Sequence, residues 1–188
     1  MSSNVIAFTA RKPLRKIVLD TETSGLYPED GHRIVELAAI EITNHEITKN
    51  LFHQYFNPER EVDEDAAEVH GLTWEELQDE PSFADYANQI AELIRDAELI
   101  IHNAPFDVSF LNSEFQRVGL PPVEDICARV TDTLAMANKL NPGGMNNLSA
   151  LCESYEIDES RFVSHGAMLD AEILAEIYLK IINGEKTR

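Results

Sequence analysis

The stretch RKIVLDTETSGL, residues 15–26, changes from an apolar run to polar and acidic residues within a few positions. Its first part, residues 15–20, combines β-branched and apolar side chains, which predicts a buried strand. Alternate residues of a strand share a face, so Val18, Asp20 and Glu22 are expected on one side where the strand ends. Like charges this close raise each other's pKa unless a cation lies between them. A strand end exposed to water is the alternative, and the Asp-x-Glu pattern alone does not decide between the two.

Two further carboxylates stand on the core-facing stripes of predicted helices. Asp107 follows Pro105, which opens a helix, and apolar residues lie three, four and eight positions after Asp107. Asp170 has apolar residues three, four and seven positions after it. For Asp107 the alternative is an acid in a first helical turn, which the free amides stabilise. For Asp170 the alternative is a basic partner, but Arg and Lys are scarce nearby in the sequence. A shared metal site explains all of them, and oxygen ligands suit magnesium or manganese.

One histidine can be connected with this group of acids. His165 precedes Asp170 by five residues, a spacing that puts the two side chains on different sides of one helix. From a loop just before the helix, the imidazole could reach the same site. An isolated histidine is more often structural, but beside a metal cluster it is the natural general base, because its pKa lies near the working pH.

The remaining pattern predicts alternating strands and helices. Further strands are expected at residues 33–42, 47–56, 98–101 and 129–132, with a hairpin turn at residues 44–46. Helices are expected at residues 82–96, 105–118, 133–140, 147–155 and 166–182. Three strands followed by alternating helices and strands predict an α/β domain with a mixed sheet.

The composition predicts one folded domain. The 188 residues are 44% apolar, which excludes a disordered chain, and the apolar runs are too short to span a membrane. Residues 15–184 are expected to form the domain, with a flexible N-terminal extension at residues 1–14 and a C-terminal tail at residues 185–188. Cys127 and Cys152 lack metal-ligand spacing and are interpreted as reduced thiols of a cytoplasmic protein.

The net charge argues against a nucleic-acid partner. Fifteen basic and 34 acidic residues give a formal charge of −19, which repels phosphates. An acidic protein with no nucleic-acid role is therefore one interpretation. Metal cations at a site would reverse the sign of the local potential.

Three segments together resemble the sequence motifs of the DEDDh exonuclease family. VLDTETSGL, residues 18–26, resembles the first motif, and HNAPFD, residues 102–107, resembles the second. HGAMLD, residues 165–170, resembles the third, in which a histidine precedes the last aspartate by five residues. VHGL, residues 69–72, resembles a further element of this family near the 3′ nucleotide. The resemblance covers residues 16–182, nearly the whole chain.

This resemblance implies a ribonuclease H-like α/β fold, in which helices flank a five-stranded mixed sheet. It implies 3′→5′ hydrolysis to nucleoside 5′-monophosphates with two divalent ions, Mg²⁺ or Mn²⁺, as cofactors. Asp20 would bridge both ions, while Glu22 and Asp170 would hold the ion near the attacking water. Asp107 would act at the second ion, directly or through water. His165 would accept the proton of the attacking water.

The resemblance also implies a set of substrate-binding residues. Three would lie along the terminal nucleotide: Thr23, Ser24 and Gly25. Three others would shape its pocket: His70, Asn103 and Phe106. Phe106 would offer an apolar face to the base, with core packing as the alternative.

The wording of the first motif favours the proofreading exonucleases of replicative DNA polymerases. The implied partners are single-stranded or mispaired DNA 3′ ends and the catalytic (alpha) subunit of DNA polymerase III. The second contact is expected to be weak, because longer members of the group carry a polymerase-binding tail after the domain and this chain stops at Arg188. An RNA exonuclease similar to ribonuclease T or oligoribonuclease is an alternative. A non-catalytic polymerase-docking module is an alternative of another class.

Overall fold

The computed structural model describes residues 15–158 and 166–185. Its centre is a five-stranded sheet in the order β3-β2-β1-β4-β5. The strands are β1 (Lys16–Thr23), β2 (Ile34–Thr43), β3 (Glu46–Tyr55), β4 (Glu98–Ile101) and β5 (Arg129–Asp132). β2 pairs antiparallel with both β1 and β3, whereas β4 pairs parallel with β1 and β5. The predicted mixed sheet with its hairpin is confirmed.

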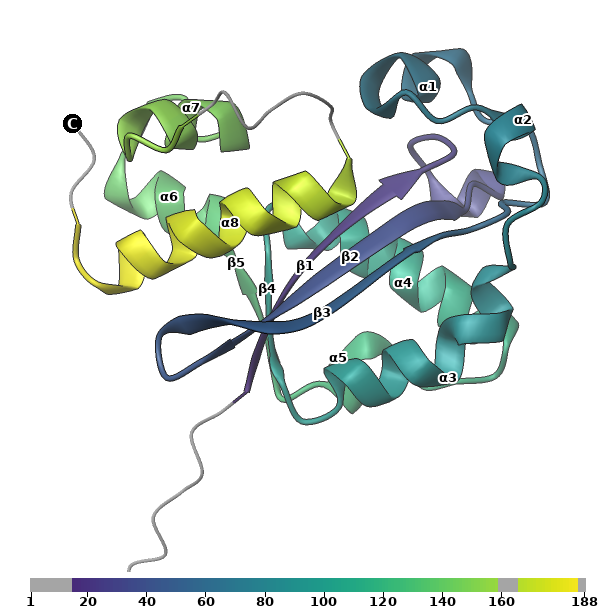
Figure 1. Ribbon diagram of the computed structural model, residues 1–188, viewed down its shortest axis with the longest axis horizontal. Coiled ribbons are helices and arrows are strands. Elements are labelled where there is room, and N and C mark those ends of the chain that lie inside the picture. The colour runs from purple at the N-terminus through teal and green to yellow at the C-terminus, as the bar shows by residue number, and fades with distance from the viewer. Residues whose placement is uncertain (1–14, 159–165, 186–188) are drawn as a thin grey trace, which may run out of the picture.

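Helices cover both faces of the sheet (Figure 1). One face carries α3 (Phe83–Ile94), α4 (Ala104–Arg117) and α5 (Val123–Ile126). The other carries α6 (Thr133–Leu140), α7 (Leu148–Ser154) and α8 (Ala167–Ile182). Near the end of β1 lie the 3₁₀ turn η1 (Pro28–Asp30), α1 (Glu64–His70) and α2 (Trp74–Leu77). No helix among the described residues combines the length and the apolar character that a membrane crossing requires.

The side chains of β1 alternate between two apolar cores. Ile17 and Leu19 pack into the core beneath α3 and α4. Val18, between them, packs on the opposite face with Leu174 and Tyr178 of α8. Because the side chains of a strand alternate, the residues after Leu19 continue toward the α8 and α4 sides in turn.

Several boundaries and short elements differ from the sequence expectations. β1 continues to Thr23, three residues past its predicted end, because the chain from Asp20 onward stays paired with β2. The helices α1, α2 and α5 were not predicted. In α1 only His70 is buried, so that helix has no apolar stripe to reveal it. α2 is a single turn held by a capping box between Thr73 and Glu76.

A buried ion pair ties α4 to the start of β2. The guanidinium of Arg33 donates from Nε and Nη2 to the two carboxylate oxygens of Glu114, at 2.6 and 2.8 Å. Both side chains are almost fully buried, and Nη1 of Arg33 also contacts Glu59 at 2.9 Å. Glu114 accepts from the backbone of Ile34 as well. This pair fixes α4, and with it Asp107, relative to the sheet.

Removing one partner of this pair should destabilise the protein strongly. Glu114→Ala removes both hydrogen bonds of Glu114 to the buried Arg33 guanidinium and leaves the exposed Glu59 as its carboxylate partner. We therefore expect a loss of about 3–5 kcal/mol in the free energy of unfolding, measured in urea. Glu92→Ala, which breaks the exposed ion pair with Arg95 on α3, is the matched control and should change the unfolding midpoint little. Equal effects of the two substitutions would contradict the structural role of the buried pair.

Candidate active site

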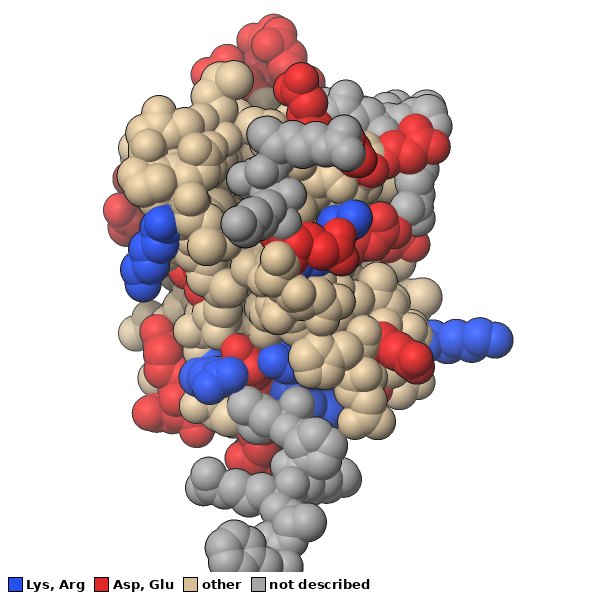
Figure 2. Space-filling model, turned by 90° about the vertical axis from the view of Figure 1, so that its left-hand side faces the viewer, with Lys and Arg blue, Asp and Glu red and all other residues tan. Residues whose placement is uncertain are grey.

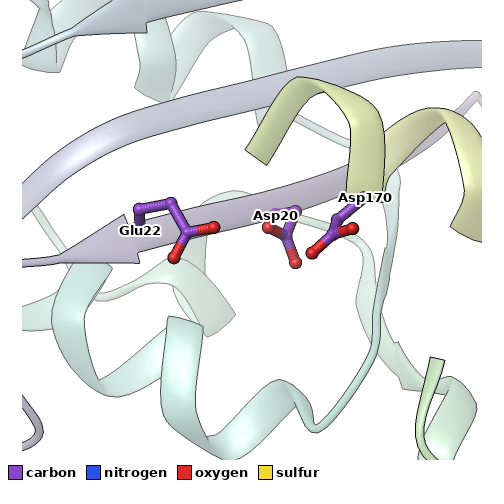
Figure 3. A group of neighbouring side chains, drawn as sticks. All are labelled: Asp20, Glu22 and Asp170. Atoms are coloured by element: carbon purple, nitrogen blue, oxygen red, sulfur yellow. The ribbon is translucent and has the colours of Figure 1, made fainter. Parts of the chain in front are cut away.

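Three carboxylates converge where β1 passes the N-terminal end of α8. Asp20 and Glu22 come from β1, and Asp170 comes from the first turn of α8. One carboxylate oxygen of each lies within 4.8 Å of the other two, and all three side chains are partly exposed. Figure 3 shows the carboxylates of Asp20 and Asp170 side by side, with Glu22 further along the strand. We name this set the acidic triad.

Small residues allow α8 to approach the sheet closely enough to form the triad. Ala167 and Ala171 of α8 pack against Ala38 and Ile40 of β2. Ala38 is the cross-strand partner of Asp20, so the contact lies directly beside the carboxylates. Larger side chains here would push the first turn of α8, which carries Asp170, away from β1.

The electrostatics of the triad favour a bound cation. Burial raises the pKa of Asp20 well above its ordinary value, and the charges of Asp107, Glu22 and Asp170 raise it further. Burial also raises the pKa of Glu22 to about 8, again with a contribution from Asp170. Carboxylates held together in this way resist ionisation unless positive charge compensates them. The donor set consists of carboxylate oxygens, which fits a hard divalent cation.

Asp107 is close to the triad but is not one of its members. Its side chain is buried, and Oδ1 accepts hydrogen bonds from the backbone N–H and the hydroxyl of Thr21, at 3.1 and 2.7 Å. Burial outweighs these hydrogen bonds and raises the pKa of Asp107 to about 7. Thr21 alternates with Asp20 and Glu22 along β1, so Asp107 approaches the strand from the α4 side. Its contact with a metal stays a prediction.

The fifth predicted catalytic residue, His165, lies outside the described residues. The described chain resumes at Gly166, the N-cap of α8. The role of His165 as a general base therefore stays a prediction.

A pocket adjoins the triad at Glu22. Its cavity of about 320 Å³ is bounded by the end of β1, by α1 and by the start of α4. Four of the six predicted substrate-binding residues line it: Thr23, Gly25, His70 and Phe106. Leu26 and Val69, both largely exposed, add apolar surface at the pocket. Phe106 also packs against Phe110 with ring centroids 5.0 Å apart, so it serves the core as well as the pocket.

The other two predicted binding residues have different surroundings. Ser24 is fully buried, and its hydroxyl accepts the backbone N–H of Arg33 at 3.0 Å and lies 3.3 Å from Nδ1 of His32. Asn103 is the left-handed N-cap of α4, and its backbone N–H donates to Asp132. Neither lines the pocket, so contact of either residue with a nucleotide stays a prediction.

His70 fixes the wall of the pocket by a defined pair of hydrogen bonds. Its Nδ1 accepts the backbone N–H of Leu72, so the proton resides on Nε2, which donates to the carbonyl of Thr23 at 3.1 Å. Burial lowers the pKa of His70, which favours this neutral form. The residue thereby joins α1 to the end of β1.

Residues 17–178 match a family model described as Exonuclease. The chain belongs to this exonuclease family. The match spans both motif regions that supply the triad, and the predicted family membership is confirmed.

Curated relatives cover most of this exonuclease. It is 48% identical over 178 residues to DNA polymerase III subunit epsilon of Pasteurella multocida, covering 93% of this chain and 70% of the relative. It is 48% identical over 177 residues to the Escherichia coli protein of the same name, covering 91% of this chain and 72% of the relative. These relatives confirm the resemblance, predicted from the first motif, to the proofreading exonucleases of replicative DNA polymerases.

Solved structures support the fold. Exonuclease X in complex with 5′ overhanging duplex DNA aligns with a TM-score of 0.67 and 24% identity, covering 90% of this chain and 92% of that chain. Escherichia coli Exonuclease I in complex with an oligonucleotide aligns with a TM-score of 0.78 and 20% identity, covering 90% of this chain and 41% of that chain. The ribonuclease H-like arrangement expected from the sequence is confirmed.

Sequence reasoning missed one carboxylate of this exonuclease. Glu36, on β2 opposite Glu22, is 1% exposed, and its charge contributes to the raised pKa of Asp20. The available signal was an acid inside the apolar run of residues 34–40. A charge in a strand with apolar neighbours on both sides is costly unless it has partners.

The raised pKa of Glu22 predicts how metal-free stability depends on pH. The pKa is about 8 in the folded state and 4.5 ordinarily, so the fold binds the extra proton. Without metal, the free energy of unfolding should therefore fall as the pH rises through the window between these values. In EDTA we expect Tm to decrease from about pH 6 to about pH 8.5, and Mn²⁺ to raise Tm more at the higher pH.

Glu22→Gln provides the control for this measurement. The amide does not titrate, so the decrease in Tm and the pH dependence of the Mn²⁺ effect should both become smaller. A Tm in EDTA that rises across this range would contradict the raised pKa of Glu22. A Tm that ignores Mn²⁺ at the higher pH would show that the triad is not a metal site.

Proposed function

We propose that this exonuclease removes nucleotides from DNA 3′ ends and that it proofreads for a replicative DNA polymerase. The observation that carries the proposal is Glu22, which belongs both to the acidic triad and to the lining of the pocket. A terminal nucleotide in the pocket would place its phosphodiester beside the triad. Cleavage of that bond releases a nucleoside 5′-monophosphate.

Each acidic residue has a proposed role in this reaction. Asp20, Glu22 and Asp170 would hold divalent cations, Mg²⁺ or Mn²⁺, and Asp107 would act beside them from the α4 side. When bound, two such ions would polarise the phosphate and stabilise the attacking and leaving oxygens. His165 would accept the proton of the attacking water.

The size of the pocket supports selection of frayed ends. A cavity of about 320 Å³ is at the small end of the range for ligand sites and suits a single nucleotide. The terminal base must leave its stack and its pair to enter the pocket. A mismatched end has already lost part of that stabilisation, so it should enter more readily.

The charge of the molecule supports a role beside a partner. The formal charge of −19 provides little long-range attraction to DNA. On the face drawn in Figure 2, most Lys and Arg side chains lie next to Asp or Glu side chains. The relatives are named as subunits of DNA polymerase III, and we propose that the catalytic (alpha) subunit presents the primer end to this exonuclease in the cytoplasm.

A side-by-side digestion tests the proposed substrate. Matched and mispaired 3′ primer ends, single-stranded DNA and short RNA should be compared with Mn²⁺ or Mg²⁺ present, and the released products identified. We expect nucleoside 5′-monophosphates, faster release from the mispaired than from the matched end, and no release by Asp20→Asn. Equal rates on both primer ends would contradict proofreading, and faster digestion of RNA would favour a ribonuclease.

The proposed general base has its own test. His165→Ala should lower the rate by roughly 10² to 10⁴-fold, the usual contribution of general-base catalysis. The limb of the pH–rate profile that rises with the deprotonation of His165 should disappear, while Mn²⁺ binding stays nearly intact. A variant with the unsubstituted rate and profile would remove His165 from the mechanism.

A further inference from the structure

Glu36 connects three elements around the acidic triad. Its Oε2 accepts the backbone N–H of Ala167, the first residue of α8, at 3.1 Å. Its Oε1 lies 2.6 Å from Nε2 of His53 on β3. A carboxylate only accepts hydrogen bonds, so His53 is the donor. A single side chain of β2 therefore reaches both a helix end and the neighbouring strand.

The N-terminus of α8 depends on this contact. The first amides of a helix have no partner within the helix and need an external acceptor. The N-cap is Gly166, which has no side chain to provide one. Glu36 supplies the acceptor from a position 131 residues away in sequence. Because a carboxylate also interacts favourably with the positive end of the helix dipole, this contact fixes the first turn of α8.

The same turn carries a member of the triad. Asp170 stands three residues after Ala167, and its backbone N–H bonds to the carbonyl of Gly166 at 3.1 Å. On β2, Glu36 lies directly opposite Glu22. Glu36 thus lies opposite the triad member Glu22 and also contacts the helical turn that carries the triad member Asp170.

The orientation of Glu36 is fixed from β3. His53 is partly exposed, with 30% of its side chain accessible, and packs edge-on against Tyr55 with ring centroids 5.0 Å apart. Tyr55 lies opposite Glu36 on β3. His53, which packs against Tyr55, therefore holds the carboxylate that caps α8.

We propose that Glu36 is a positioning residue, which holds the first turn of α8 and thereby Asp170 against Asp20 and Glu22, with His53 fixing Glu36 in place. This inference rests on the proposed function of the triad. The two carboxylate oxygens of Glu36 contact His53 and the amide of Ala167, so Glu36 acts through the position of Asp170. A displacement of about 1 Å in such an arrangement is sufficient to lower a rate about 10²-fold.

The test compares substitutions that keep or remove the hydrogen-bond acceptor. Glu36→Gln retains an oxygen for the amide of Ala167, whereas Glu36→Ala removes it. For Glu36→Ala we expect kcat for release of nucleotides to fall about 10–10²-fold with KM for DNA nearly unchanged. Glu36→Gln should recover most of that loss. Mn²⁺ binding, followed by electron paramagnetic resonance without DNA, should weaken in the Ala variant and recover in the Gln variant.

His53→Ala keeps the inference testable if Glu36→Ala does not fold. This partly exposed position tolerates truncation, and the loss in kcat and in Mn²⁺ affinity should have the same direction and a smaller size. His45→Ala, in the exposed β2–β3 turn, is the matched control and should leave both quantities unchanged.

Three outcomes would overturn the inference. They are unchanged kcat and Mn²⁺ affinity in folded Glu36→Ala, a Gln variant as impaired as the Ala variant, and a loss confined to KM. The failure of the proposed function would look different, because the unsubstituted protein would then release no nucleotides from any DNA. The Mn²⁺ measurement decides on Glu36 in that case too, since it needs no substrate.

Discussion

β1 is paired on both edges and packed on both faces, and its side-chain alternation determines which groups meet at the site. Ile17 and Leu19 occupy the core under α3 and α4, while Val18 meets α8. The same alternation then directs Asp20 toward α8 and Thr21 toward Asp107 of α4. A one-residue slip in the pairing register of β1 would exchange the side chains of its two faces. The groups that now face α8 would then face α3 and α4, and the reverse. The apolar half of β1 therefore sets the register in which its acidic half meets α8 and α4.

The acids at the end of β1 oppose folding as a group, so other parts of the structure must offset their repulsion. The raised pKa values of Asp20, Glu22 and Asp107 show that the folded structure disfavours their charged forms. Tight packing of small residues between α8 and β2 contributes, as does the buried Arg33–Glu114 pair between β2 and α4. A cation site needs carboxylates that the surrounding structure holds close together. If the carboxylates could move apart, the negative potential that attracts the ion would become weaker.

The sequence was sufficient for the parts of the site that follow from periodicity. Strand alternation placed Asp20 and Glu22 together, and the three- and four-residue spacing after Asp170 put it on the inner side of its helix. Periodicity could not find α1, because that helix buries only His70. Periodicity also could not show that the Ser24 side chain is buried beside the pocket and does not line it. That burial depends on a hydrogen bond from the backbone N–H of Arg33, which lies nine residues later in the sequence.

Glu36 was missed for a different reason. Its partners are an amide and an imidazole that are distant in the chain, and only the assembled sheet and α8 bring them together. An acid within an apolar strand is visible in sequence, but its partner is not.

The shared position of Glu22 has a consequence for selectivity. The pocket side of the site is apolar at Leu26, Val69 and Phe106, and the other side is acidic. In the proposed function, a nucleotide that enters would have to satisfy both sides at once, with its base against apolar surface and its phosphate against cations held by the carboxylates. In a molecule whose overall charge repels DNA, long-range attraction contributes little to this choice. Discrimination in the proposed function would then depend on how readily a 3′ end gives up its terminal base. The pocket would convert this property of the substrate end into a difference in rate.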